Sequence, residues 1–240
     1  MEAILGIIGG LGPMATVYFM EKIISMTEAD EDQKHIPMLV AHVPQVPDRT
    51  AYILDNTKPS PVPPMIRAGQ FLEQNGASEL AIPCITAHSF HKEMQDALSV
   101  PLINGVEETA RYLDQKGMEK VGIMATEGTV HTGLFTRALG DKGMKVIVPD
   151  RRHQGYVSDL IYKDIKAGRT PDKAKIENVR EHLLGMGAQV ILLGCTELSI
   201  IDKALTPRSL YLDVMEVLAR TCVQRFGKLK KEYRELLLAP

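Results

Sequence analysis

The feature that most constrains the fold is the alternation of short, almost entirely apolar runs with longer segments of helical periodicity. Such runs are typical of strands in a parallel sheet covered by helices on both faces, because neither face needs polar residues. The expected strands are Ala3–Ile8, Pro37–Val43, Leu80–Pro83, Leu102–Ile103, Val121–Ala125, Lys145–Val148, Val190–Leu193 and Leu210–Leu212. This pattern predicts an α/β fold with mainly parallel sheets, which carries its site at the carboxyl ends of the strands.

Helical periodicity fills the segments between these runs. The expected helices are Ala15–Met26, Pro64–Asn75, Glu107–Lys116, Thr132–Leu139, Gly155–Ala167, Asp172–Met186 and Asp213–Phe226. The charged tail Lys228–Pro240 is expected to form a surface helix. The uncharged stretch Ala3–Met20 is long enough for a membrane span, but the glycine turn inside it favours a buried strand followed by a helix.

Three pairs of segments suggest that the chain consists of two similar halves. Gly76–Cys84 and Gly187–Cys195 match most clearly, since both read as a helix end, a strand and then a cysteine. Two further pairs show about the same offset: Ile4–Ile8 with Val121–Ala125, and Leu102–Asn104 with Tyr211–Asp213. We therefore expect two pseudo-symmetric three-layer α/β domains with the active site in the cleft between them. The first would span residues 1–103 and be completed by 212–240, and the second would span 104–211.

Composition excludes several classes of function. Twenty-eight Lys and Arg against 30 Asp and Glu give a net charge of −2, which argues against a nucleic-acid surface or a polybasic membrane surface. Aromatic residues make up 5% and Trp is absent, so a base-stacking platform is not expected. The three cysteines, Cys84, Cys195 and Cys222, are too few and too scattered for a disulfide framework, so we expect a cytoplasmic protein with reduced thiols.

Cys84 and Cys195 each lie at the carboxyl end of an expected strand, before a turn that contains threonine and should begin a helix. A helix N-terminus lowers the pKa of a thiol because its N–H groups and dipole stabilise the thiolate. Two such thiols from two similar halves suggest acid–base chemistry on opposite faces of one substrate. Cys222 falls inside a helix and reads as an ordinary core thiol.

The surroundings of these cysteines resemble a known family. Pro83–Phe90 and Gly194–Glu197 are similar to the two signatures of the aspartate/glutamate racemase superfamily, and within it to the aspartate racemase branch. Further motifs of that branch are matched in order along almost the whole chain by Gly6–Pro13, Pro47–Thr50, Ala125–Thr129 and Lys166–Gly168.

The resemblance implies an isomerase that inverts the α-carbon of an acidic amino acid, aspartate or glutamate, without pyridoxal phosphate, any other cofactor or a metal. Cys84 and Cys195 would alternate as base and acid, Cys84 taking the proton from the D-enantiomer and Cys195 from the L-enantiomer. It also implies a homodimer. Arg49 and Lys166 would hold the substrate's carboxylates, since Arg binds a carboxylate bidentately and Lys supplies a point charge. The other expected substrate contacts are Leu11, Ile85, Thr86, Thr126, Thr129, Thr196 and Glu197.

One departure from the branch leaves a rival function open. Its members usually carry Asn directly after the first cysteine, whereas this chain has Ile85, which removes a side-chain amide from the site. An altered substrate, or binding of a small carboxylic metabolite with little turnover, is therefore the alternative.

Two other sites are weaker alternatives. Gly10, Gly12 and Ala15 form part of a dinucleotide-binding pattern, but no acidic residue follows the second expected strand. A zinc site could gather Cys84, His88, His91 and Cys195, although their spacing is not a common zinc pattern.

Overall fold

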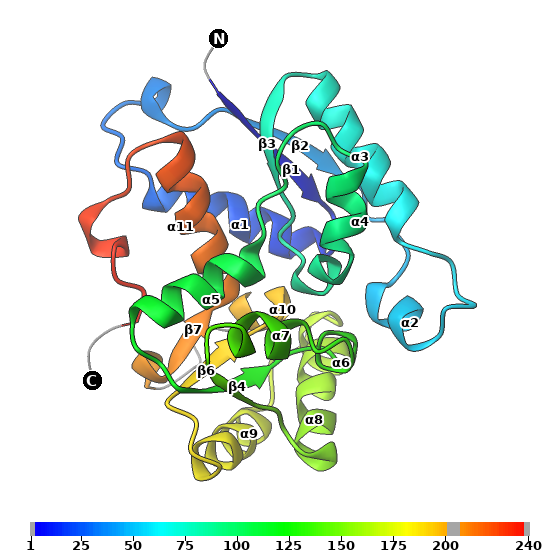
Figure 1. Cartoon of the computed structure of the whole chain (residues 1–240), viewed down its shortest axis with the longest axis vertical. Coiled ribbons are helices and arrows are strands. Elements are labelled where there is room, and N and C mark those ends of the chain that lie inside the picture. The colour runs from blue at the N-terminus through cyan, green and yellow to red at the C-terminus, as the bar shows by residue number, and fades with distance from the viewer. Residues whose placement is uncertain (1–2, 201–206, 238–240) are drawn as a thin grey trace.

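A computed structural model describes residues 3–200 and 207–237, which form two parallel β-sheets surrounded by helices (Figure 1). The first sheet has the order β2-β1-β3, with β1 at Ile4–Gly9, β2 at Met38–His42 and β3 at Ala77–Ala81. The second has the order β5-β4-β6-β7, formed by β4 (Lys120–Met124), β5 (Lys145–Ile147), β6 (Val190–Leu193) and β7 (Tyr211–Asp213). All of these strand pairs are parallel, which confirms the predicted α/β class.

The two sheets share one topology over their first three strands. β1 and β4 are central, β2 and β5 form an outer edge, and β3 and β6 lie on the other side of the central strand. The similar segments Gly76–Cys84 and Gly187–Cys195 contain β3 and β6. Cys84 and Cys195 therefore follow equivalent strands of the two sheets.

The helices cover both sheets, and several short ones stand directly beside the strand ends. In the first half of the chain they are α1 (Pro13–Met26), α2 (Arg49–Leu54), α3 (Val62–Gln74), α4 (His91–Asp96) and α5 (Gly105–Gln115). In the second half they are α6 (Glu127–His131), α7 (Leu134–Gly140), α8 (Arg151–Ser158), α9 (Lys173–Gly185), α10 (Thr196–Ile200) and α11 (Val214–Phe226). A 3₁₀ segment, Ile85–Phe90, follows β3, and a π-helix, Asp159–Ile165, continues α8. None of the described helices has both the length and the apolar character needed to cross a bilayer.

Three apolar clusters explain why the strands contain so few polar residues. Leu5 and Ile7 of β1 face a central cluster that also contains Val121 and Ile123 of β4, together with α1, α5 and α11. Ile8 faces the opposite way, into a second cluster with α3. A third cluster joins β6 to α8 and α9. Both faces of the inner strands β1, β4 and β6 are thus buried over most of their length, as the uninterrupted apolar runs predict, whereas the edge strands β2 and β5 are partly exposed.

The last helix connects the second sheet back to the first part of the chain. β7 pairs with β6, and α11 begins directly after it and packs against α1 and α5 (Figure 1). The expected domain boundaries at 103/104 and 211/212 stay a prediction, and the second falls within β7.

Two expected elements are absent from the described residues. Leu102–Ile103 forms only an isolated parallel bridge between Leu102 and Leu80 rather than a strand. The tail, described up to residue 237, contains one 3₁₀ turn at Lys231–Tyr233 and no longer helix, so that prediction is wrong there. The backbone of the tail instead bonds to the end of α1, through Glu28 N–H to Lys228 O and Lys230 N–H to Met26 O, which holds it extended. Residues 238–240 lie outside the described part.

Candidate active site

The carboxyl ends of the two sheets meet around a small buried chamber. It is lined by Leu11, Asp48, Arg49, Thr50, Cys84, Ile85, Thr86, Thr126, Tyr162, Lys166, Cys195, Thr196 and Glu197. Every residue that the sequence proposed for the site is among them except Thr129, which contacts the lining residues Thr86 and Thr126 from behind. The centre of a water molecule can reach only about 10 Å³ of the chamber. That is room for about one water, so the chamber is closed to anything larger.

Cys84 comes between β3 and the 3₁₀ segment Ile85–Phe90, and its side chain is buried. The guanidinium of Arg49 lies near this thiol, and both line the chamber. Burial alone would lower the pKa of Arg49, but its attraction to Cys84 and Asp48 outweighs burial and raises that pKa. A permanent positive charge therefore stands beside Cys84.

Cys195 comes between β6 and α10, and it contacts a negative charge instead. Its thiol donates a hydrogen bond to Oε2 of Glu197, with Sγ and Oε2 2.9 Å apart. Burial first, and then the carboxylate of Glu197, raise the pKa of Cys195 well above its usual value. The expectation of a lowered pKa from the helix N-terminus is therefore wrong for this thiol, because desolvation and Glu197 outweigh the five-residue helix α10.

Comparison with known proteins identifies the family. Residues 8–222 match the family described as Asp/Glu/Hydantoin racemase. The chain belongs to this racemase family. Its fold is similar to that of Picrophilus torridus aspartate racemase, with a TM-score of 0.84 and 33% identity over 98% of this chain and 100% of that chain. It is 26% identical to the broad specificity amino-acid racemase RacX of Bacillus subtilis (strain 168), over 92% of this chain and 97% of the relative. An aspartate racemase homologue from Pyrococcus horikoshii OT3 has the same fold, with a TM-score of 0.76 and 23% identity over 95% of this chain and 100% of that chain.

The racemase holds Arg49 through backbone carbonyl groups. Nη1 donates to the carbonyl oxygens of Val46 and Pro47, at 3.3 and 3.1 Å, and Nη2 donates to that of Leu11, at 3.1 Å. Arg49 is the first residue of α2. Asp48 precedes it and caps the helix by accepting a hydrogen bond from the Ala51 N–H. Arg49 thus joins the β2–α2 loop to the glycine turn after β1 and keeps its positive charge near Cys84.

Three threonine hydroxyls form a triangle at the contact between the two halves. Thr86, which follows Cys84, lies 3.0 Å from Thr126 (Oγ1 to Oγ1), and both lie within 3.1 Å of Oγ1 of Thr129. Thr126 also caps α6 by accepting from the N–H of Thr129. Each hydroxyl can donate once and accept twice, so the three bonds of Thr126 fill its capacity, whereas Thr86 makes two and can form one more. Thr196 hydrogen-bonds to Glu197 at 3.3 Å.

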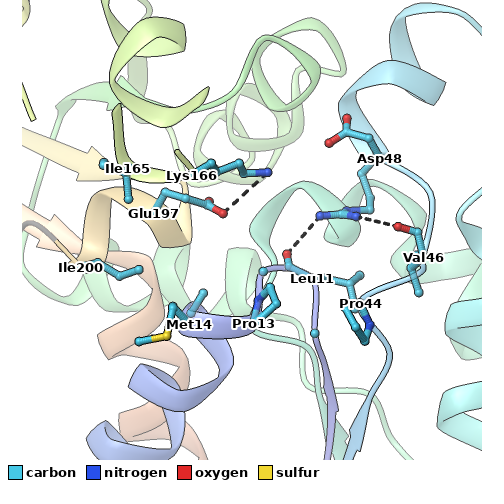
Figure 2. Close-up of a pocket in the computed structure, with 14 residues that line it drawn as sticks. Leu11, Pro13, Met14, Pro44, Val46, Asp48, Ile165, Lys166, Glu197 and Ile200 are labelled. Atoms are coloured by element: carbon cyan, nitrogen blue, oxygen red, sulfur yellow. Dashed lines mark hydrogen bonds and ion pairs between the residues drawn. The ribbon is translucent and has the colours of Figure 1, made fainter. Parts of the chain in front are cut away.

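Lys166 and Glu197 point toward one another at the outer boundary of the chamber, as Figure 2 shows. Nζ of Lys166 is 3.7 Å from Oε1 of Glu197 and 4.9 Å from the centre of the Tyr162 ring. Burial lowers the pKa of Lys166, but its attraction to Glu197 and Cys195 more than offsets this effect and raises it. Lys166 is therefore a cation in the site.

Three residues that line the chamber were not expected from the sequence. Asp48 and Thr50 flank Arg49 in the same motif, so their position next to Arg49 could have indicated that they line the site. Tyr162 is four residues before Lys166, which puts the two on one face of a helix. Tyr162 lines the chamber together with Thr50, and burial raises the pKa of its phenol. Nothing in the sequence indicates the π-helix that carries it.

The geometry does not support the dinucleotide and zinc alternatives. Gly10 has a φ of 91°, and a Cβ there would lie 2.6 Å from the backbone nitrogen of Val43, so this turn packs against the β2 end rather than opening onto a ligand. His88 and His91 hydrogen-bond to backbone carbonyl groups. In the described part of the chain, the only cluster of three potential metal ligands is Asp150, His153 and His182, at the surface of α8 and α9.

Proposed function

We propose that this racemase inverts the α-carbon of an amino acid without a cofactor, using Cys84 and Cys195 as opposed acid and base. The observation that carries the proposal is that two thiols from equivalent strand ends of two similar sheets line one buried chamber. A single base would return the proton to the face from which it came. Inversion needs a base on one face and an acid on the other.

The chemistry follows from the two environments. When the substrate is the D-enantiomer, the Cys84 thiolate removes the α-proton and the Cys195 thiol delivers its own proton to the opposite face. The reverse reaction exchanges these roles. Glu197, 2.9 Å from Cys195, keeps that thiol protonated in the resting state. The negative charge that develops on the substrate carboxylate is met by the N–H groups of the turns after each cysteine, and by the hydroxyls of Thr86 and Thr196 once these turn from their present partners.

The proposed substrate class is the acidic amino acids, as the sequence predicts. The similarity to an aspartate racemase supports this class, and the similarity to a broad specificity racemase supports a wider range. We also infer a homodimer and a cytoplasmic location, which size-exclusion chromatography with light scattering and cell fractionation test directly.

The deciding experiment follows exchange of the α-proton for deuterium by NMR in deuterium oxide, without added cofactor. Wild-type protein should label both enantiomers of at least one amino acid among aspartate, glutamate, leucine and methionine. Cys84→Ala and Cys195→Ala should each abolish racemisation, whereas Cys222→Ala, a buried cysteine of α11 outside the chamber, should retain it. No labelling by wild type, with substrate analogues still bound, would support the alternative of a binding protein with little turnover.

A further inference from the structure

Two imidazoles and a carboxylate come together outside the chamber, where α8 packs against α9 (Figure 1). Asp150 and His153 lie at the start of α8, and His182 lies in the last turn of α9. One potential ligand atom of each residue, a ring nitrogen or a carboxylate oxygen, lies within 4.8 Å of the other two. None of the three residues lines the chamber.

The packing of the two helices holds both imidazoles in place. Their rings stack with centroids 3.9 Å apart and planes 9° apart, and only 16% of the His153 side chain and 18% of the His182 side chain are exposed. Val157 of α8 and Leu183 of α9 belong to the same apolar cluster. Tyr156 meets His153 edge-on, with ring centroids 5.9 Å apart. The fold therefore brings these rings together, unlike two mobile side chains that meet on a surface.

The two carboxylate oxygens of Asp150 have different surroundings. Oδ1 caps α8 by accepting from the backbone N–H of His153 at 2.9 Å, and it lies 2.7 Å from Nδ1 of that ring. Oδ2 faces His182, with Nε2 4.0 Å away. This distance is too long for a hydrogen bond. A zinc ion, with ligands at about 2.0–2.2 Å, fits between the two atoms once they approach by less than about 1 Å.

Both rings can offer an unprotonated nitrogen, which metal binding requires. Nε2 of His182 accepts a hydrogen bond from the backbone N–H of Asp150 at 3.3 Å, so this nitrogen carries a lone pair. His153 offers Nδ1 when its proton is on Nε2, and the ion then takes the place of the proton between Nδ1 and Asp150. Because the ring planes are nearly parallel, one ring must tilt about its Cβ–Cγ bond for both nitrogens to reach one ion.

We propose that Asp150, His153 and His182 bind one divalent transition-metal ion of the zinc type, with water in the remaining position. Two imidazoles and one carboxylate suit Zn²⁺, whereas Ca²⁺ and Mg²⁺ prefer a shell of oxygen ligands. The bound ion ties the start of α8 to the end of α9.

Two connections lead from this site to the chamber. α8 continues into the π-helix Asp159–Ile165, whose Tyr162 lines the chamber. Gln154, next to His153, donates from Nε2 to the carbonyl oxygen of Ala125 at 2.9 Å, directly before Thr126 of the chamber lining. An ion at the start of α8 thus stabilises the helix that supports part of this lining.

Calorimetric titration of zinc chloride into protein freed of metal by EDTA measures the binding. Wild type should bind zinc at this site and unfold at a higher temperature with zinc present, as a ligand that binds only the folded state requires. Calcium and magnesium chloride should produce neither effect. His153→Gln and His182→Gln should each weaken zinc binding by about tenfold or more, whereas His131→Gln, at an exposed position, should leave it unchanged.

Asp150→Asn separates the carboxylate from the helix cap. Asn caps a helix about as well as Asp, so α8 should keep its start while zinc binding weakens by about tenfold or more. Zinc binding as tight as in wild type, in all three variants at Asp150, His153 and His182, would overturn the proposal, as would the lack of any zinc binding by wild type.

Cobalt distinguishes this site from the thiols of the chamber. Co²⁺ bound by nitrogen and oxygen ligands should give visible absorption bands without the near-ultraviolet charge-transfer band of a cobalt–thiolate bond. A thiolate band that Cys84→Ala or Cys195→Ala removes would place the ion in the chamber and overturn the proposal. None of these measurements depends on racemase activity, so the two-cysteine function stands or falls separately.

Discussion

The Sγ atom of Cys195 lies 2.9 Å from Oε2 of Glu197. The other carboxylate oxygen of Glu197 faces Lys166, with Oε1 and Nζ 3.7 Å apart. The carboxylate thus contacts a thiol and an ammonium group at once, at the outer boundary of the chamber. Its negative charge favours the protonated form of Cys195, which makes this thiol suited to donate a proton first.

Substituting Glu197 should therefore change the pH dependence of one direction of the reaction. Burial would still raise the pKa of Cys195 in Glu197→Gln, but the repulsion from the carboxylate would be gone, so the pKa should be lower than in wild type. Because Cys195 must be protonated to act as the acid on D-substrate, the alkaline decline of kcat/KM should begin at lower pH. Glu181→Gln, at an exposed position of α9, serves as the control. An unchanged or more alkaline decline would refute the assigned role of Glu197.

Acid should destabilise the protein through His88. Burial, followed by repulsion from His91, lowers the pKa of His88 to about 4, below an unfolded value of about 6.5. The unfolded chain therefore binds the proton first, and stability is lost as pH falls from about 6.5 to 4. The loss should amount to about 3 kcal/mol, read from urea unfolding at intervals across that range. His88→Gln should flatten the dependence whereas His131→Gln, at an exposed position, should not; equal slopes in both variants would disprove the prediction.

Alkali should act through the buried thiols. Burial raises the pKa of both Cys195 and Cys222, so above pH of about 8.5 the unfolded chain loses protons that the folded chain keeps. Stability should fall with rising pH by up to about 1.4 kcal/mol per pH unit for each thiol. Cys222→Ala should remove one of the two contributions to the slope in urea unfolding between pH 8 and pH 10 (about the range over which a thiol titrates). A slope identical to wild type would show that Cys222 does not contribute.

The contact between α2 and α6 should tolerate no added atom at Gly128. A Cβ there would lie 2.9 Å from Oγ1 and 3.0 Å from Cα of Thr50, so Gly128→Ala must displace α2, which carries Arg49. We expect a loss of about 1–3 kcal/mol in the free energy of unfolding and a lower kcat. Gly140→Ala, in α7 with open space around its Cβ position, should be neutral or slightly stabilising. If both variants behave alike, the close approach at Thr50 is not a constraint.

The threonine triangle offers a test of hydroxyl function apart from packing. Thr126→Val keeps the shape but loses the α6 cap and the bonds to Thr86 and Thr129, which should cost about 1–2 kcal/mol of stability. It should also lower kcat, since Thr126 lines the chamber. Thr126→Ser retains the hydroxyl and should recover most of both losses in urea unfolding and deuterium incorporation. No recovery in the serine variant would indicate a role for the methyl group instead.

The sequence predicts those parts of the site that depend on local pattern. The positions of Cys84 and Cys195 are predictable because each cysteine follows a buried strand. The carboxyl ends of parallel strands meet at one edge of a sheet, where sites of α/β proteins lie. Arg49 shows the limit: its partner Leu11 is 38 residues away, and only the folded β2–α2 loop brings the two together. The raised pKa of Cys195 could not be predicted from the sequence either, since it depends on burial and on the position of the Glu197 carboxylate.

Longer-range geometry also explains the expected elements that did not form. Leu102–Ile103 has a strand-like composition, but it meets β3 through a single bridge at Leu80 and continues into α5. The tail has helical periodicity, yet backbone bonds to Met26 and Glu28 at the end of α1 hold it extended. Tertiary contacts decided both cases against local propensity.

The small size of the closed chamber has a kinetic consequence. If Cys84 and Cys195 act as proposed, each conversion leaves the thiol and the thiolate exchanged, so the enzyme that releases L-product is in the form that binds L-substrate. Before it can accept another D-substrate, a proton must pass from Cys84 to Cys195, and the closed chamber has room for about one water to carry it. At high substrate concentration this reset of the free enzyme, rather than removal of the α-proton, would set the turnover rate.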